Sequence, residues 1–125
     1  MSVIYNTGVL IGADRNDRRI WADHNARLDL GVVPTTTAPV VAQASRSPVQ
    51  AQLRRLLRGC EVTAFLPGAA HEVGSLLART GLSDVVDAHV VVTASRQSSV
   101  VLTSDPTDLR TLSAALPTPV QVLAI

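Results

Sequence analysis

Four of the ten acidic residues in this 125-residue chain form two close pairs in its C-terminal third, Asp84 with Asp87 and Asp105 with Asp108. The members of each pair are three residues apart, so on a helix they would share one face. Carboxylate oxygens are ligands that Mg²⁺ and Mn²⁺ prefer, and the chain contains no lysine that could neutralise them. We therefore predict that all four carboxylates contribute to a site for a hard divalent cation.

The surroundings of Asp87 make it the most informative of the four. The helix expected from Ser83 to about Arg96 is otherwise rich in valine and alanine, which is typical of a buried helix. An ionised carboxylate in such a helix is costly unless it has a partner. Asp84 has an alternative explanation, because the helix dipole favours an acidic residue in the first turn. The same explanation stays open for Asp87, although that residue lies further into the helix.

Asp105 comes two residues after an apolar segment, residues 99–103, that is expected to be a buried strand. Ligands of open α/β sheets bind at the carboxyl ends of the strands, which is where this residue would lie. The alternative is a structural role, with Asp105 as the N-cap of a helix that begins at Pro106 and Asp108 as an ordinary first-turn acid. The clustering of several acids at such positions favours the metal site.

The remaining polar residues give weaker signals. His24, His71 and His89 lack the spacing of metal ligands and are better explained as core or surface residues. The arginines at 54, 55 and 58 indicate either a solvated helix face or an RNA contact. The chain has no P-loop, G-x-G-x-x-G or G-x-S-x-G motif, which argues against nucleotide cofactors and serine hydrolysis.

Length and composition indicate one globular domain over residues 1–125, because 46% of the residues are hydrophobic and the net charge is only +1. The single cysteine, Cys60, excludes an intramolecular disulfide and is expected to be a small buried residue at the start of a strand. The sequence has no apolar stretch long enough for a membrane span and no secretion signal, so we expect a cytoplasmic protein without membrane contact.

Short β-branched segments alternate with longer helical ones, which predicts a mostly parallel sheet covered by helices on both faces. The expected strands are 2–5, 31–34, 61–65, 99–103 and 120–125. The expected helices are 14–27, 39–46, 48–58, 67–79, 83–96 and 106–116, with Ser83 as an N-cap and Gly59 ending the third.

The order of these segments resembles PIN domains along essentially the whole chain, and the chain's size points to the bacterial VapC toxins among them. The opening segment Val3–Ile11 is similar to the first PIN motif, in which an aspartate stands at the position of Asn6. The stretch 36–43 is similar to the second motif, with Gln43 in place of the usual glutamate. The stretches 83–88 and 101–105 match the third and fourth motifs, and the 18-residue separation of Asp87 and Asp105 makes this pair specific.

The resemblance implies a three-layer α/β/α domain with a sheet of about five strands. It implies a metal-dependent endoribonuclease in which Asn6, Asp87 and Asp105 take the catalytic positions, and these three with Asp84 and Asp108 hold Mg²⁺ or Mn²⁺. The metal would activate water for in-line attack on the RNA backbone and leave 5′-phosphate and 3′-hydroxyl ends. The expected substrate is a structured RNA of the tRNA or rRNA class. The expected partners are a cognate antitoxin and a second copy of the chain. The second copy is expected to contact apolar residues of the two central helices, Val40, Val41, Leu53, Leu56 and Leu57.

Two amides depart from this pattern. Asn6 and Gln43 keep an oxygen but lack the charge of a carboxylate, so the resemblance predicts a weakened metal site. Asn6 is either natural or a substitution that silences a toxic enzyme. The main alternative is a non-catalytic PIN-like module that binds RNA or protein. A response-regulator-like domain is a third alternative, but it would want paired acids after the first strand and a late lysine.

Overall fold

The centre of the molecule is a parallel sheet of five short strands in the order β3-β2-β1-β4-β5. The computed structural model describes residues 2–125. Its strands are β1 (Val3–Tyr5), β2 (Thr35–Thr37), β3 (Glu61–Thr63), β4 (Val100–Thr103) and β5 (Val122–Ala124). Because all strands run the same way, their carboxyl ends meet at one edge, where Asn6 and Asp105 follow β1 and β4. The predicted sheet is confirmed.

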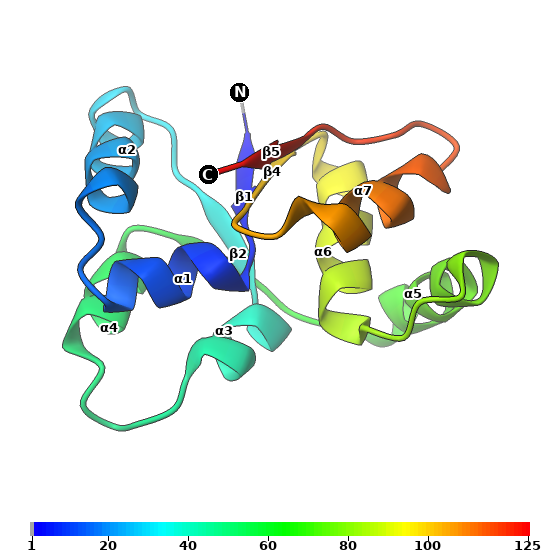
Figure 1. Cartoon of the computed structure of the whole chain (residues 1–125), viewed down its shortest axis with the longest axis horizontal. Helices are drawn as coiled ribbons and strands as arrows, with labels where there is room; N and C mark the ends of the chain where they lie inside the picture. Colours follow the sequence, from blue (N-terminus) through cyan, green and yellow to red (C-terminus); the bar gives the residue numbers. More distant parts are fainter. Residues whose placement is uncertain (1) are drawn as a thin grey trace.

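Helices cover both faces of the sheet, as parallel strands require. They are α1 (Thr7–Asp14), α2 (Arg18–Asp29), α3 (Ala38–Ala44), α4 (Ala51–Arg58), α5 (Pro67–Thr80), α6 (Val85–Gln97) and α7 (Pro106–Ala114). Figure 1 shows α1, α2 and α4 on one side of the sheet and α5, α6 and α7 on the other. The predicted three-layer α/β/α arrangement is confirmed. Within residues 2–125, no helix combines the length and the apolar character needed to cross a bilayer.

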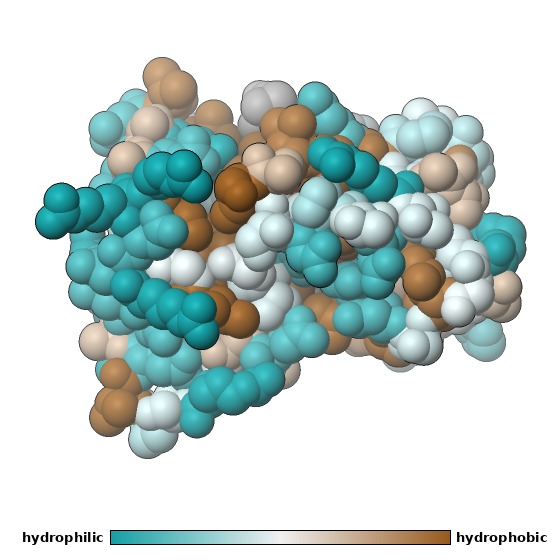
Figure 2. Space-filling model, viewed as in Figure 1, coloured by the Kyte–Doolittle hydropathy of each residue, from teal (hydrophilic) through white to brown (hydrophobic). Residues whose placement is uncertain are grey.

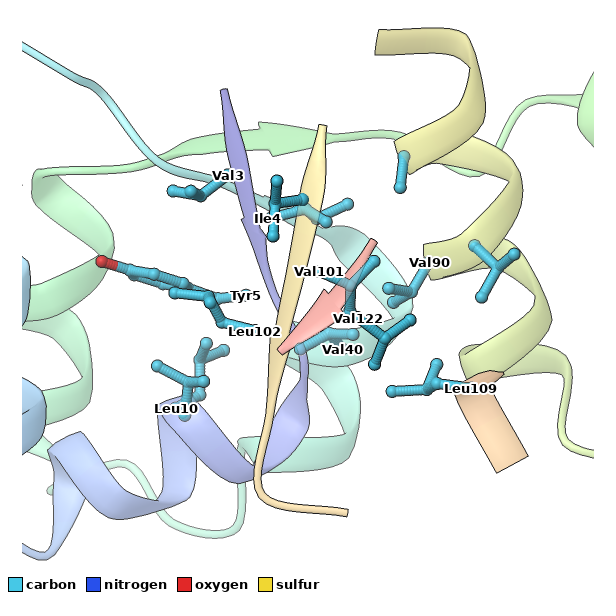
Figure 3. Close-up of a cluster of buried hydrophobic side chains, with 14 of the residues drawn as sticks. Val3, Ile4, Tyr5, Leu10, Val40, Val90, Val101, Leu102, Leu109 and Val122 are labelled. Atoms are coloured by element: carbon cyan, nitrogen blue, oxygen red, sulfur yellow. The ribbon is translucent and has the colours of Figure 1, made fainter. Parts of the chain in front are cut away.

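The core has two halves because neighbouring side chains on a strand point to opposite faces. Figure 3 shows Tyr5 and Leu102 directed towards α1, whereas Val101 and Val122 point towards α6 and α7. The strands β1 and β4 are buried along their whole length, so both faces of the central sheet are covered. The end of β1 is therefore held rigidly between the two helical layers.

The second strand lies further along the chain than the predicted segment 31–34. That segment was chosen for its valines, but Val33 is 52% exposed, whereas Thr36 and Thr37 in β2 are fully buried. β-branched threonines suit a strand, and the Thr36 hydroxyl donates to the backbone oxygen of Tyr5 at 3.0 Å. The prediction was wrong because buried threonines whose hydroxyls have partners look polar in the sequence.

The segment after β1 also differs from the prediction. The opening strand ends at Tyr5, as predicted, but the residues after it form a helix that was not expected, α1 over Thr7–Asp14. The helix predicted over 14–27 instead begins at Arg18, with Asp17 as its N-cap accepting from the backbone N–H groups of Arg19 and Ile20. Asn16 has a φ of +62°, which asparagine tolerates better than most residues and which separates α1 from α2.

Smaller corrections concern helix starts and a predicted contact surface. The N-cap of α6 is Asp84 rather than Ser83, and α4 begins at Ala51, well after Pro48. Gly59 is the C-cap of α4, as predicted. The apolar residues of α3 and α4 were expected to meet a second copy of the chain. Val40, Leu53 and Leu56 are buried within the chain itself, and Val41 and Leu57 are partly buried against the same core, so most of this apolar surface is used inside the chain.

Candidate functional site

Asn6 lies at the carboxyl end of β1 and is 6% exposed. Its backbone is extended at the N-cap position of α1, but its side chain makes no capping hydrogen bond. Instead the Nδ2 group donates to Asp87 Oδ1 at 3.4 Å and to Thr103 Oγ1 at 3.3 Å. The Oδ1 atom is buried and accepts no hydrogen bond. Buried polar atoms almost always have a partner, so this oxygen is a candidate ligand atom.

Asp87 lies in the first turn of α6, in contact with Asn6. Burial raises the pKa of its carboxyl group, and the nearby charge of Asp84 raises it further. The hydrogen bond from Asn6 lowers the pKa, whereas Asp108 and Asp105 add smaller upward contributions. No arginine forms an ion pair with Asp87 within residues 2–125. The carboxylate is therefore held in a field of like charge, which a bound cation would relieve.

Asp84 has a structural role that the sequence had left open. Its carboxylate accepts the backbone N–H of Asp87 at 3.1 Å and so caps α6. The side chain is exposed, yet its charge is felt by Asp87. The capping explanation is thus confirmed for Asp84 without excluding a second role beside the site.

Asp105 and Asp108 reach the same edge from β4 and the start of α7. Asp105 occupies the N-cap position of α7, but its side chain makes no capping hydrogen bond. Its carboxylate is therefore free to bind a ligand. Its backbone N–H donates to Thr103 Oγ1 at 3.1 Å. Both carboxylates are exposed to solvent. Thr103, which lies in the stretch 101–105 that matches the fourth PIN motif, therefore links Asn6 to Asp105.

Gln43 lies on α3, and its amide oxygen accepts a hydrogen bond from the Thr7 hydroxyl. No hydrogen bond joins it to Asn6 or to the four aspartates within the described chain. At this second departure from the PIN pattern, the amide oxygen already has a partner. Thr7 had no signal in the sequence, because its role depends on the approach of α3 to α1.

The polar groups at this edge of the sheet are carboxylate and amide oxygens, which are the donors that Mg²⁺ and Mn²⁺ prefer. Among residues 2–125, no three histidine, cysteine, aspartate or glutamate side chains lie close enough together to hold a metal ion. Asn6 and the four aspartates Asp84, Asp87, Asp105 and Asp108 form what we call the acidic edge of the sheet. It offers one half-buried carboxylate, Asp87, and one buried oxygen without a partner, that of Asn6. These oxygen donors suit Mg²⁺ or Mn²⁺ in type but are few in number. Oxygen donors of the preferred type are therefore present at this edge, but residues 2–125 form no complete metal site.

The other predicted candidates lie away from this edge. His24 and His89 are buried, the former hydrogen bonded to Tyr5 and the latter stacked on Phe65. The exposed arginines of α4 face away from the core, and Arg55 lies over the ring of Trp21, 4.3 Å from its centre. Burial raises the pKa of Cys60, just before β3, to about 12. None of these residues forms part of the acidic edge.

The sequence matches no family model and no curated protein. Solved structures resemble the fold closely. One is VapBC2 from Rickettsia felis, which was solved bound to a DNA fragment from its promoter. It has a TM-score of 0.74 at 14% identity, over 100% of this chain and 99% of that chain. VapBC-1 from nontypeable Haemophilus influenzae has a TM-score of 0.72 at 15% identity, over 99% of this chain and 98% of that chain.

The chain has a PIN-like fold. A toxin–antitoxin complex from Klebsiella pneumoniae agrees, with a TM-score of 0.66 at 16% identity over 98% of this chain and 96% of that chain. The resemblance inferred from the sequence motifs is therefore confirmed at the level of the fold. In this PIN-like fold, the acidic edge lies at the carboxyl ends of β1 and β4, where α/β sheets bind their ligands.

Proposed function

We propose that the chain is a toxin-type endoribonuclease with a weak Mg²⁺ or Mn²⁺ site at the acidic edge. The observation that carries the proposal is the buried Asn6 Oδ1, which has no partner and lies beside the half-buried Asp87. Asp87, Asp105 and Asn6 would hold the cation, with Asp84 and Asp108 adding negative charge. The proposed substrate is a structured RNA of the tRNA or rRNA class.

Each side chain has a distinct part in this proposal. A bound Mg²⁺ or Mn²⁺ would polarise the scissile phosphate and lower the pKa of water for attack. Asp87 supplies a carboxylate whose position is fixed by α6, while Asp105 supplies one that solvent and RNA can reach. Thr103 orients both the Asn6 amide and the backbone of Asp105.

A second function is favoured by one contact. The Asn6 amide donates to Asp87 and so supplies part of the positive character that a cation would bring. A chain stabilised in this way would bind RNA or protein without cleaving it. The titration described next separates the two functions.

The test is to replace Asn6 with aspartate and to titrate both forms with Mn²⁺ by calorimetry. The variant adds a charged oxygen ligand, so we expect Mn²⁺ to bind at least about tenfold more tightly, equivalent to about 1.4 kcal/mol. RNA cleavage should rise with it. Asn25→Asp adds the same charge on the exposed face of α2 and should change neither quantity. Equal Mn²⁺ affinity in wild type and Asn6→Asp would favour the binding-only function.

We further propose that a cognate antitoxin covers the acidic edge and that the chain pairs with a second copy. The antitoxin part draws on the toxin–antitoxin complexes among the similar structures, and the second copy is proposed from the resemblance to VapC toxins. Expression of Asn6→Asp should arrest growth of the host unless the antitoxin is co-expressed. Light scattering that gives the mass of a single chain at high concentration would contradict the dimer.

A further inference from the structure

A groove of about 760 Å³ adjoins the acidic edge on the side of α1 and α2. Gly8 and Ser104 line the end nearest the acidic residues, and Arg15 and Arg19 line the end where α1 passes into α2. Figure 2 shows this hollow, with hydrophobic atoms in its floor between extended hydrophilic side chains. The groove therefore runs from the proposed catalytic edge to a pair of arginines.

The positive charges of the groove are only partly neutralised. Arg27 pairs with Asp23 at 2.6 Å, and Asp17 is engaged as the N-cap of α2. By contrast, the guanidinium groups of Arg15 and Arg19 make no ion pair or hydrogen bond within residues 2–125 and are exposed. Two free guanidinium groups at one end of a groove are suited to phosphate, which they bind in a bidentate manner.

The floor of the groove is apolar. Ile20, Leu123 and Ile125 line it, and Leu123 and Ile125 are 38% and 42% exposed. Exposed apolar side chains beside arginines are suited to an unpaired base, which stacks on apolar and guanidinium groups alike. An apolar floor for bases and unpaired guanidinium groups for phosphates together point to a nucleotide chain.

The groove and the acidic edge are joined by one short turn. Ser104 lies between Thr103 and Asp105, and Gly8 lies two residues after Asn6. The helix α1 that separates the two ends of the groove is eight residues long, about 12 Å. An RNA chain cleaved at the acidic edge would thus continue over α1 towards Arg15.

We infer that this groove binds the single-stranded nucleotides that flank the scissile phosphate, with Arg15 and Arg19 holding their phosphates and Ile125 contacting a base. The inference rests on the proposed nuclease function, which it extends by naming the path of the RNA. It commits to RNA because the two free arginines and the continuity with the acidic edge are both explained by one continuous substrate.

The test measures binding of a short fluorescein-labelled single-stranded RNA by anisotropy, with a chelator present so that no cleavage occurs. Arg15→Gln/Arg19→Gln should weaken binding about tenfold or more and make the slope of log K against log salt shallower by about 1.4, because two phosphate contacts are lost. Arg54→Gln/Arg58→Gln removes the same charge from exposed positions on α4 and should leave the slope unchanged. Circular dichroism should show that both variants fold.

A third variant separates base contact from phosphate contact. Ile125→Ser should weaken binding several-fold without altering the salt slope, because it removes apolar surface and no charge. If the Arg15/Arg19 variant binds RNA like wild type, or if both arginine pairs weaken binding equally, the inference is overturned. In the first case the groove is a surface for protein instead.

Failure of this inference can be told from failure of the nuclease proposal. A chain that gains Mn²⁺ affinity with Asn6→Asp but binds RNA independently of Arg15 and Arg19 keeps the nuclease function and loses the groove. A chain that gains no Mn²⁺ affinity but needs both arginines for RNA keeps the groove as an RNA-binding surface, which supports the inference.

Discussion

Tyr5 and Asn6 are consecutive residues at the end of β1, yet the buried polar group of Tyr5 has its hydrogen-bond partners and that of Asn6 lacks one. The Tyr5 hydroxyl is hydrogen bonded to His24 Nδ1 at 2.8 Å and accepts from Arg27 at 3.3 Å. Asn6 makes only two long hydrogen bonds through Nδ2 and leaves its Oδ1 without a partner. The cluster around Tyr5 is complete in itself, whereas the acidic edge is not.

The pKa shifts of the buried groups also differ between the Tyr5 cluster and the acidic edge. Burial raises the pKa of Tyr5 to about 12 and lowers that of His24, so the phenol stays protonated and the imidazole neutral. The phenol then donates to the imidazole and accepts from the guanidinium, and every group keeps its preferred state. At the acidic edge, burial and neighbouring acids raise the pKa of Asp87, so its charged form is disfavoured. A satisfied cluster indicates a structural role, and an unsatisfied one indicates a ligand.

The largest expected difference between the regions is in stability. Tyr5→Phe removes both hydrogen bonds and leaves buried His24 Nδ1 without a partner, which should lower the free energy of unfolding by about 1–3 kcal/mol. Asn6→Ala should cost less than about 1 kcal/mol, because the hydrogen bonds it removes are long. Urea denaturation of both variants is the measurement. Equal losses would end the distinction between the two regions.

A smaller effect is expected when the pH is lowered. Burial, Arg27 and Arg55 lower the pKa of His24, and Asp23 only partly offsets them. Below the ordinary histidine pKa of about 6.5, the unfolded chain therefore binds more protons than the folded one. The free energy of unfolding should decrease as the pH is lowered through this range. Melting temperatures between about pH 7 and pH 5 should show this decrease.

The matched variant is His24→Phe, which should flatten the pH dependence without abolishing it, because burial also lowers the pKa of His89. His71→Gln replaces an exposed histidine on α5 and should leave the dependence as it is. A pH profile that is identical in wild type and His24→Phe would contradict the role of His24.

The smallest change is expected for Asp87→Ala in the metal-free protein. Because its pKa is raised, Asp87 favours the folded state only while protonated and opposes folding once the pH rises through its folded pKa. At neutral pH the variant should therefore melt at the same temperature or higher. If Asp87 instead stabilises α6, the loss should be on the order of 1 kcal/mol.

The same variant should lose any RNA cleavage when combined with Asn6→Asp. Melting with and without Mn²⁺ provides the second readout, since only the chain with Asp87 should be stabilised by the metal. A destabilised Asp87→Ala protein that still cleaves RNA would show that this residue belongs to the scaffold.

Much of the fold could be predicted from the periodicity of apolar residues and from the proline and glycine residues that mark helix ends. The buried strand β4 and the helices α5 to α7 lie close to their predicted positions, since proline or glycine marks most of their ends. β2 was missed because its three buried threonines look polar, and α1 was missed because Gly8 and Gly12 weaken its helical pattern. In both cases tertiary contacts outweigh local preference.

The site was predictable in its residue types and less so in its connections. The position of Asp105 after a strand placed it at the sheet edge, and its spacing from Asp87 matched both residues to PIN motifs. No pattern could show that Asn6 would donate to Asp87 through Nδ2. Likewise, the link from Thr103 to both Asn6 and Asp105 depends on the parallel register of β1 and β4. Sequence indicates which groups are available, and only the fold decides which of them are satisfied.

The contact between Gly8 and Ser104 sets a limit on how this sequence can evolve. A Cβ atom at position 8 would overlap the Ser104 hydroxyl and lie 2.8 Å from its Cβ, whereas Gly68 and Gly74 have nothing within 4 Å. Positions 68 and 74 should therefore drift freely among descendants of this chain. Position 8 can acquire a side chain only after position 104 has lost its own, so the two sites should change in a fixed order.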